Sequence, residues 1–129
     1  YTSMGYYGRL GAIQNYSAVT AALLMVKKSL YKKLGGLDES LAVALNDVDF
    51  CLRLREKGYW NVFTPYCEAW HYESVSRGYE TSPEKLVRFN KEIEYFKERH
   101  NDALEKGDPF YNPNLSLLSE AFDYKEFDS

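Results

Sequence analysis

The clearest hydrophobic pattern in the chain lies in residues 46–58, which read NDVDFCLRLREKG. Val48, Cys51 and Leu52 recur at the spacing of one helical face, and basic residues fill the second half of the segment. Two aspartates stand in the first turn and a glycine ends the run, which are common start and stop signals of a helix. The pattern predicts a helix from about residue 47 to residue 57.

The segments before this helix predict one strand and one short helix. Residues 17–26 are small and then apolar, which favours a buried strand. Ser29 can cap a short helix over residues 30–34, and the pair Gly35-Gly36 supplies a left-handed stop. The first fifteen residues show no clear periodicity, so we expect an irregular segment there.

Two strands are predicted after the central helix. Residues 59–64 have strand composition and are followed by a proline, and residues 67–72 alternate by residue. In the second of these strands Cys67, Ala69 and His71 would share one face, since side chains alternate between the two faces of a sheet.

A long helix is predicted in the last third of the chain, after a polar loop at residues 74–81. Ser82-Pro83-Glu84 is a strong helix start, and the helix would run to about Leu104. Its apolar stripe comprises Leu86, Phe89, Ile93 and Phe96. The element order is that of a mixed α/β domain, and it has few strands for a self-contained α/β sheet. We therefore expect a further half to be missing.

Composition narrows the function classes. The 129 residues suggest one domain, and the hydrophobic fraction of 45% is ordinary for a globular protein. Sixteen basic and 19 acidic residues give a net charge of −3, which argues against sequence-independent nucleic-acid binding. No apolar run reaches the length of a membrane-spanning helix. The chain starts at Tyr1 without a methionine or a signal-peptide pattern, which suggests a fragment.

The two cysteines, Cys51 and Cys67, do not form a C-x-x-C pair, so a zinc ribbon or a redox motif is not expected. We expect both to be buried free thiols in an intracellular protein.

Asp47 and Asp49 are the candidate carboxylates of the central helix. They stand about 200° apart around its axis, so they cannot work as a pair on one face. If one faces a site, the other is expected to face solvent or to cap the helix, and Asn46 or Asp47 would suit the N-cap. From these residues alone, capping and catalysis both remain open for Asp47.

The segment after the predicted strand at 67–72 also contains candidate chemistry. His71 leads into a loop that holds Ser74, Ser76 and Arg77, and these residue types suit a phosphate or a metal-bound diphosphate. A surface loop with a histidine at a strand end is the alternative. His100, late in the last helix, is expected to provide a favourable charge near the helix end.

Two further features have alternative interpretations. Twelve tyrosines and two tryptophans suit sugar stacking, but they suit cores and interfaces equally. The basic cluster favours a solvated face, with an acidic membrane surface as the alternative; it comprises Lys27, Lys28, Lys32 and Lys33.

Taken in order, four segments resemble one known family. These are residues 18–28, 35–39, 46–58 and 71–78, and the tail 108–116 adds to the likeness. Together they resemble the C-terminal half of a family 2 glycosyltransferase, of the bacterial kind that builds O-antigen and related polysaccharides, including rhamnosyltransferase-like members. We interpret residues 1–129 as a single fragment with a core at about residues 17–118.

The resemblance implies an α/β fold, namely the C-terminal portion of a type A glycosyltransferase fold. That fold, termed GT-A, has a Rossmann-like sheet that binds a nucleotide-diphospho-sugar, followed by an acceptor-binding half. This chain would supply the acceptor side and would lack the N-terminal nucleotide-binding strands.

The resemblance also implies roles for individual residues. Asp47 matches the general base that deprotonates the acceptor hydroxyl as this hydroxyl attacks the anomeric carbon with inversion. His71 matches a histidine that helps to hold a divalent metal, Mg or Mn, on the leaving diphosphate. Thr20 matches a segment on the acceptor side. The residues implied to bind beside the diphosphate are Ser74, Ser76 and Arg77.

The sequence departs from the family pattern in three ways. Asn46 stands where the family usually has a glutamate before the base, which removes one acid but keeps a capping side chain. Ala21 stands where a glycine is common, which narrows the acceptor side next to Thr20. No Asp-x-Asp metal motif precedes Tyr1, so much of the donor site and the metal site would need the missing half.

The implied partners are a nucleotide-sugar donor and a saccharide or lipid-linked saccharide acceptor, with no nucleic acid. A cytoplasmic location is expected, with peripheral contact with the cytoplasmic face of the inner membrane. The fragment alone is expected to be inactive and could form oligomers through exposed apolar surface. The alternative function is a non-catalytic sugar- or protein-binding interaction module.

Overall fold

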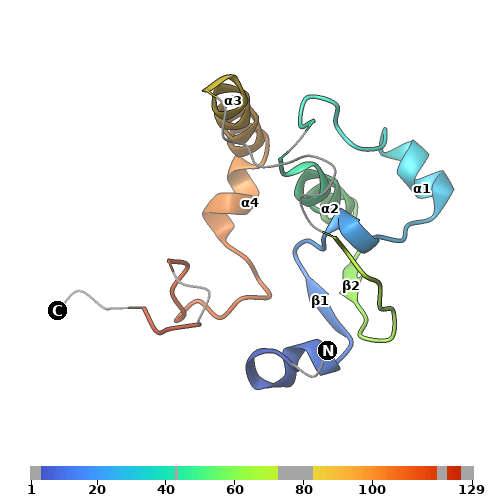
Figure 1. Cartoon of the computed structure of the whole chain (residues 1–129), viewed down its shortest axis with the longest axis vertical. Helices are drawn as coiled ribbons and strands as arrows, with labels where there is room; N and C mark the ends of the chain where they lie inside the picture. The colour runs from blue at the N-terminus through green and yellow to red at the C-terminus, as the bar shows by residue number, and fades with distance from the viewer. Residues whose placement is uncertain (1–3, 43, 73–82, 119–121, 126–129) are drawn as a thin grey trace.

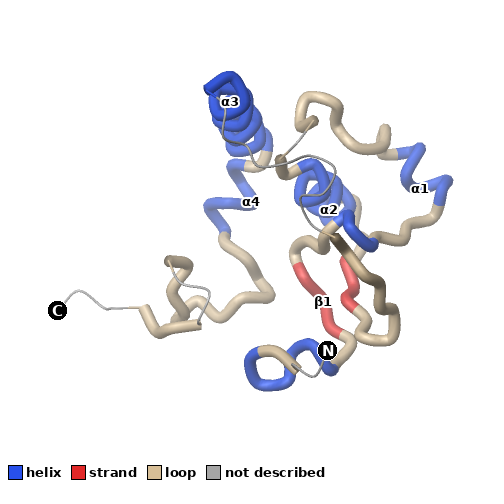
Figure 2. The backbone as a smooth tube through the Cα atoms, viewed as in Figure 1, coloured by secondary structure: helices blue, strands red, loops and turns tan. Residues whose placement is uncertain are grey.

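The structure is a computed structural model of the 129-residue chain, and it describes residues 4–42, 44–72, 83–118 and 122–125. In that part of the chain, helices and loops predominate over short strands (Figure 2). The elements are η1 (Tyr6–Gly11), β1 (Gln14–Tyr16), η2 (Ala21–Leu23), α1 (Lys28–Lys33), α2 (Asn46–Glu56), β2 (Asn61–Phe63), α3 (Pro83–Arg99) and α4 (Asn101–Lys106).

The helix α2 is the centre of the molecule. In Figure 1 it lies between α1 on one side and α3 and α4 on the other, with the β1–β2 ribbon below it. Its residues 49–54 are all buried, so the helix is covered nearly all round rather than along a single stripe. The predicted helix is confirmed, and Gly58 follows its end with a φ of 80°, a left-handed conformation that glycine adopts at low cost.

The start of α2 differs from the prediction. Leu45 is the N-cap residue, it adopts a left-handed φ of 61°, and no side chain caps the helix. The prediction that Asn46 or Asp47 is the N-cap is therefore wrong. The left-handed conformation is uncommon for leucine, and Leu45 is partly buried against the core.

A small apolar core joins α2 to α3. Leu41, Leu52 and Phe96 form it, and Leu45 and Val48 pack against it. Phe96 is the buried member of the predicted stripe on α3, whereas Leu86 of the same stripe is 47% exposed. The core therefore involves the C-terminal half of α3 rather than the whole helix.

The strands β1 and β2 form a two-stranded antiparallel ribbon in which Tyr16 pairs with Asn61. The side chain of Asn61 is buried and donates from Nδ2 to the carbonyl oxygens of Ser17, at 2.8 Å, and Cys51, at 3.1 Å. These bonds attach the ribbon to α2. The predicted strand at residues 59–64 is thus confirmed in shorter form, while β1 forms where an irregular segment was predicted.

Two predicted strands are wrong. Residues 17–26 contain the turn η2 instead of a strand, because Thr20 Oγ1 accepts from the Ala22 N–H and the Ala21 N–H donates to a side chain of α2. These backbone groups are then not available for a sheet. Residues 67–72 are exposed and form no strand, since no neighbouring strand of the described chain pairs with them.

The helices near both ends of the chain follow their predictions in part. The short helix α1 forms before Gly35 and Gly36, both at positive φ. Lys28, Lys32 and Lys33 of α1 and Lys27 before it are all exposed, as both interpretations of this basic cluster require. The last helix is interrupted where it was predicted to continue: His100 has a φ of −111° and a ψ of 24°, and it separates α3 from α4. The predicted cap Ser82 lies outside the described residues.

Few hydrophobic side chains of the described chain are buried, namely Leu41, Phe50, Cys51, Leu52, Leu54 and Phe96. No helix within the described ranges is long and apolar enough to cross a membrane. The GT-A fold, and the place of residues 1–129 within it, stay predictions.

Candidate functional site

Asp47 projects from the first turn of α2 toward the segment that precedes α1. Its Oδ2 accepts a hydrogen bond of 3.0 Å from the backbone N–H of Ala21, which is 26 residues away in sequence. Its Oδ1 accepts from the Val48 N–H at 2.9 Å. The side chain is only half-buried, so both bonds orient a carboxylate that solvent still reaches.

Thr20 lies directly beside the group that holds this carboxylate. Its Oγ1 accepts from the Ala22 N–H at 3.2 Å, which starts the turn η2 and exposes the Ala21 N–H to Asp47. Thr20 itself is exposed. The structure therefore brings together two of the residues that the sequence singled out, Asp47 and Thr20.

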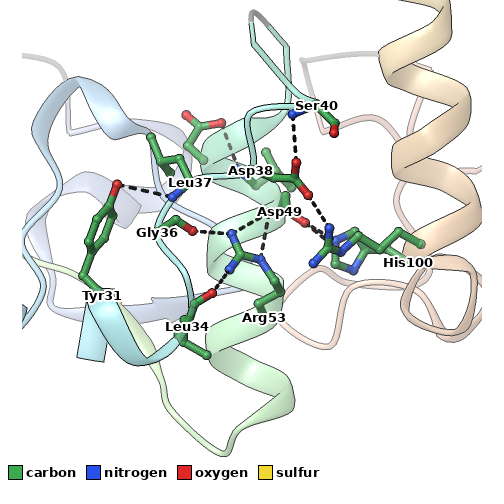
Figure 3. A network of polar contacts seen from close by, with 12 residues as sticks. Tyr31, Leu34, Gly36, Leu37, Asp38, Ser40, Asp49, Arg53 and His100 are labelled. Carbon is green, nitrogen blue, oxygen red and sulfur yellow. Dashed lines mark hydrogen bonds and ion pairs between the residues drawn. The ribbon is translucent and has the colours of Figure 1, made fainter. Parts of the chain in front are cut away.

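Asp49, by contrast, is completely buried in an ion-pair network, shown in Figure 3. Its Oδ2 lies 2.8 Å from both Nε and Nη2 of Arg53. Its Oδ1 lies 2.9 Å from Nε2 of His100 and 3.3 Å from Nε of Arg99. The prediction that the second aspartate faces solvent or caps the helix is wrong, because nitrogen atoms of Arg53, Arg99 and His100 contact it in the interior.

The same network fixes the loop after α1. Arg53 donates from Nη1 to the carbonyl oxygen of Leu34, at 2.6 Å, and from Nη2 to that of Gly36, at 2.7 Å. Carbonyls at a helix C-terminus lack partners within the helix, and Arg53 provides one. His100 directly follows the last residue of α3, and it is likewise internal and 2% exposed. Its role as a favourable charge near the helix end stays a prediction.

A second set of contacts extends the network to the surface. Asp38 accepts from the Ser40 N–H at 2.8 Å, from Tyr95 Oη at 2.9 Å and from Arg99. The Ser40 hydrogen bond, followed by that of Tyr95 and the charge of Arg99, holds the pKa of Asp38 below its ordinary value, although partial burial acts in the opposite direction. This cluster links the loop before α2 to the end of α3.

The two aspartates of α2 therefore have different chemical capacities. Asp49 is saturated with donors and inaccessible, whereas Asp47 has two backbone donors and an open side. A carboxylate that is to accept a proton from a bound molecule must be reached by it. Of the two, only Asp47 meets that requirement.

The other predicted site residues are not assembled in the described chain. His71 is exposed, and Ser74, Ser76 and Arg77 lie outside the described residues. Within the described ranges, no group of three or more His, Cys, Asp and Glu side chains could hold a metal ion. These residues do not by themselves form a metal site, so we derive no step through a metal.

The two thiols differ in environment. Cys51 is buried beside Asp47, and its Sγ lies 3.7 Å from the Val19 carbonyl oxygen. Burial raises the pKa of the Cys51 thiol above its ordinary value. Cys67 is exposed, so the prediction of a second buried thiol is wrong.

Comparison with known proteins adds the sequence context. No family model matches the chain, and no solved structure matches it significantly. The chain is 52% identical over 122 residues to the uncharacterized protein y4gI of Sinorhizobium fredii, a match that covers 92% of this chain and 13% of that protein. It is 33% identical over 113 residues to the O-antigen biosynthesis protein RfbC of Myxococcus xanthus, covering 88% of this chain and 8% of that protein.

A further relative is the N-acetylglucosaminyl-diphospho-decaprenol L-rhamnosyltransferase of Mycobacterium tuberculosis, which is 25% identical over 83 residues. That match covers 64% of this chain and 27% of the enzyme. The chain is thus similar in sequence to one protein named for O-antigen biosynthesis and to one rhamnosyltransferase. It spans only a small part of the length of the relatives that it matches.

The family resemblance of the sequence and the geometry around Asp47 involve the same residues. The helix start with Asp47 and the segment with Thr20 are among the segments that carry the family resemblance, and they lie against each other. The buried partners of Asp49 were not found from the sequence. The spacing of Asp49 and Arg53, four residues apart on one helix, was the available signal.

Proposed function

We propose that the chain is the acceptor-side, C-terminal part of an inverting, GT-A-type glycosyltransferase of family 2, and that Asp47 is its general base. The observation that carries the proposal is the 3.0 Å bond between Asp47 Oδ2 and the Ala21 N–H. It orients an accessible carboxylate beside the exposed Thr20, while Asp49 is saturated. The relatives named for O-antigen biosynthesis and rhamnosyl transfer support it.

In the proposed reaction, Asp47 removes the proton from an acceptor hydroxyl. The hydroxyl oxygen forms a bond to the anomeric carbon of the donor sugar, and the bond between that carbon and the nucleoside diphosphate breaks on the opposite face. The configuration is thereby inverted, and the proton remains on Asp47 until solvent removes it. A positioned base of this kind contributes about 10²- to 10⁴-fold to the rate.

The donor side of the proposal depends on residues that the described structure does not bring together. His71 would contact a divalent metal, Mg or Mn, and Ser74, Ser76 and Arg77 would contact the diphosphate. When bound, such a metal would offset the negative charge of the leaving group. The remaining ligands and the nucleotide-binding strands would come from outside this chain.

We also propose the partners and location that such an enzyme needs. The donor is a nucleotide sugar, and the acceptor is a saccharide or a lipid-linked saccharide. A cytoplasmic enzyme that reaches a lipid-linked acceptor would touch the membrane surface peripherally, and the exposed lysines of and before α1 would suit anionic lipid head groups.

The test is Asp47→Asn in the complete gene product that contains this sequence. Sugar transfer should fall by at least about 100-fold, while binding of the nucleotide-sugar donor is retained. The matched control is Glu39→Gln, which removes an exposed acid away from the helix start and should leave transfer unchanged. Near-normal turnover of Asp47→Asn would refute the assignment of the base.

A second variant addresses the donor side. His71→Ala should weaken metal-dependent donor binding without unfolding the protein, since His71 is exposed. An unchanged metal requirement and donor affinity would contradict its role.

The alternative is a non-catalytic module that binds sugars or proteins through its exposed aromatic side chains. It predicts no transfer from any nucleotide sugar by the complete gene product. A nucleotide-binding half with an Asp-x-Asp motif in that product would favour the enzyme.

A further inference from the structure

A groove of about 800 Å³ lies at the end of α2 opposite to Asp47. It is bounded by the last turn of α2, by residues 58–60, and by the junction of α3 and α4. Asp47 and Glu56 are separated by about 14 Å along the helix axis, at about 1.5 Å per residue. The groove is therefore distinct from the surroundings of Asp47, and its volume is in the usual range for ligand pockets.

One rim of the groove is aromatic. Tyr59 and Trp60 line it and are 43% and 68% exposed. Trp60 contacts Phe110 edge to face, with ring centroids 6.0 Å apart, so the indole is held in place without being buried. Large aromatic rings that stay exposed beside a cavity offer flat apolar faces to a ligand.

The rim on α4 is polar and carries charges of both signs. Asn101, Asp102 and Lys106 line the groove there, and Glu56 of α2 also lines the groove. Charges of both signs in one groove do not select a strongly anionic or cationic ligand. Amide, carboxylate and ammonium groups together suit a neutral ligand that both donates and accepts hydrogen bonds.

The floor of the groove includes a buried nitrogen without a hydrogen-bond partner. His100 lines the groove, and its Nδ1 is the one buried side-chain atom of the described chain that lacks such a partner. Its Nε2 lies 2.9 Å from Asp49 Oδ1. A carboxylate only accepts, so in the neutral ring Nε2 carries the hydrogen and Nδ1 is an acceptor.

In the neutral ring, the carboxylate beside this nitrogen does not satisfy it. Glu56 Oε1 lies 3.5 Å from Nδ1 of His100, and an ionised carboxylate cannot donate a hydrogen bond. The Glu56 side chain is 56% exposed, so it can turn toward solvent and leave room for a ligand beside Nδ1. In the neutral ring Nδ1 lacks a donor, which a ligand hydroxyl would supply, and Glu56 would accept from a second hydroxyl.

We propose that this groove binds a saccharide, with Trp60 and Tyr59 against a sugar ring and a sugar hydroxyl donating to His100 Nδ1. Sugars combine an apolar ring face with hydroxyls that donate and accept, which are the features that the two rims and the floor require. The inference rests on the proposed function only for the role of this saccharide, which would be a distal part of the acceptor.

The experiment titrates the full chain with a panel of neutral oligosaccharides that contain glucose, galactose, mannose, rhamnose or N-acetylhexosamine. Binding is followed by saturation-transfer NMR and by backbone amide shifts. At least one oligosaccharide should bind with a millimolar or lower Kd and should shift the amides of residues 56–60 and 100–106. Absence of binding by the whole panel would overturn the proposal.

Matched variants locate the site. Trp60→Ala should weaken binding at least tenfold, whereas Trp70→Ala, which removes an indole that is 82% exposed and does not line the groove, should leave the Kd unchanged. Equal losses in Trp60→Ala and Trp70→Ala would place the saccharide elsewhere and overturn the proposal. Asp47→Asn is assayed beside them for sugar transfer.

The same variants separate this inference from the proposed function. Binding that depends on Trp60 in a gene product that transfers no sugar would support the groove and refute the glycosyltransferase. Transfer that depends on Asp47, together with oligosaccharide binding that does not depend on Trp60, would support the glycosyltransferase and refute the saccharide site in the groove.

Discussion

Oδ1 of Asp49 lies 2.9 Å from Nε2 of His100, a residue 51 positions later in the chain (Figure 3). Both side chains are completely buried, and the contact joins the first turn of α2 to the junction of α3 and α4. Because Arg53 and Arg99 contact the same carboxylate, two residues of α2 and two of the α3–α4 junction meet at one buried charge. This network and the small apolar core both join α3 to α2.

The first prediction concerns this buried carboxylate. Asp49→Asn should lower the free energy of unfolding by about 3–5 kcal/mol, because removal of one partner leaves buried cations without their counter-charge. Asp47→Asn is the matched control on the same helix turn, and it should cost less than about 1 kcal/mol because its side chain is only half-buried. Urea unfolding followed by circular dichroism measures both. Equal costs for the two variants would contradict the network.

The second prediction concerns pH. The hydrogen bond from the Ser40 N–H lowers the pKa of Asp38 in the folded protein, so the ionised carboxylate stabilises the fold above its unfolded pKa of about 3.9. That contribution is lost as the pH falls through the lower, folded pKa. Asp38→Asn should lower the free energy of unfolding at pH 7 by about 1–3 kcal/mol.

The difference between the wild type and Asp38→Asn should shrink when urea unfolding is repeated below about pH 4. Glu39→Gln, at the adjacent exposed position, should show neither the loss at pH 7 nor the pH dependence. A stability difference that stays constant from pH 7 to pH 2.5 would argue against the charged hydrogen bond.

The elements that were predicted correctly are those whose signals are local. The helix α2 has its periodicity and its glycine stop within thirteen residues, and both are enough to define it. The ribbon of β1 and β2 depends on pairing between Tyr16 and Asn61, which local composition at residues 14–16 does not reveal. The predicted strand at 17–26 failed for the same reason, since the Ala21 N–H is used by a side chain from a distant segment.

The residues of the candidate site also differ in whether the sequence could predict their roles. Asp47 and Thr20 could be selected from the sequence because they lie in segments that resemble a known family, and the structure places them together. The roles of Asp49 and His100 could not, because they depend on a contact between residues 51 positions apart in the chain. Cys67 was expected in a strand, and without a partner strand its thiol stays exposed.

The third prediction uses the two thiols. Under native conditions a thiol reagent such as DTNB should modify Cys67 rapidly and Cys51 only after unfolding, because Cys51 is buried and its thiol has a raised pKa. Cys67→Ser should abolish the fast reaction, and Cys51→Ala should leave it unchanged. Two equally fast thiols in the native protein would contradict the packing of α2 against the segment that includes Val19.

The last prediction tests the bond that orients Asp47. Ala21 is the first residue of η2, and Thr20 before it has a φ of −66° and a ψ of 141°, a conformation that suits the residue before a proline. Ala21→Pro should therefore keep the fold and delete only the N–H that donates to Asp47 Oδ2. If Asp47 is the base of the proposed transfer, kcat in the complete gene product should fall roughly tenfold, which corresponds to about 1.4 kcal/mol of lost transition-state stabilisation. Donor affinity should stay the same.

Ala21→Gly is the matched control, because it keeps the N–H and removes only a methyl group. It should retain most of the activity. If the proline and glycine variants lose the same activity, the backbone bond does not position Asp47. If both remain fully active while Asp47→Asn is inactive, the carboxylate acts without this support, and the packing of α2 alone places the base.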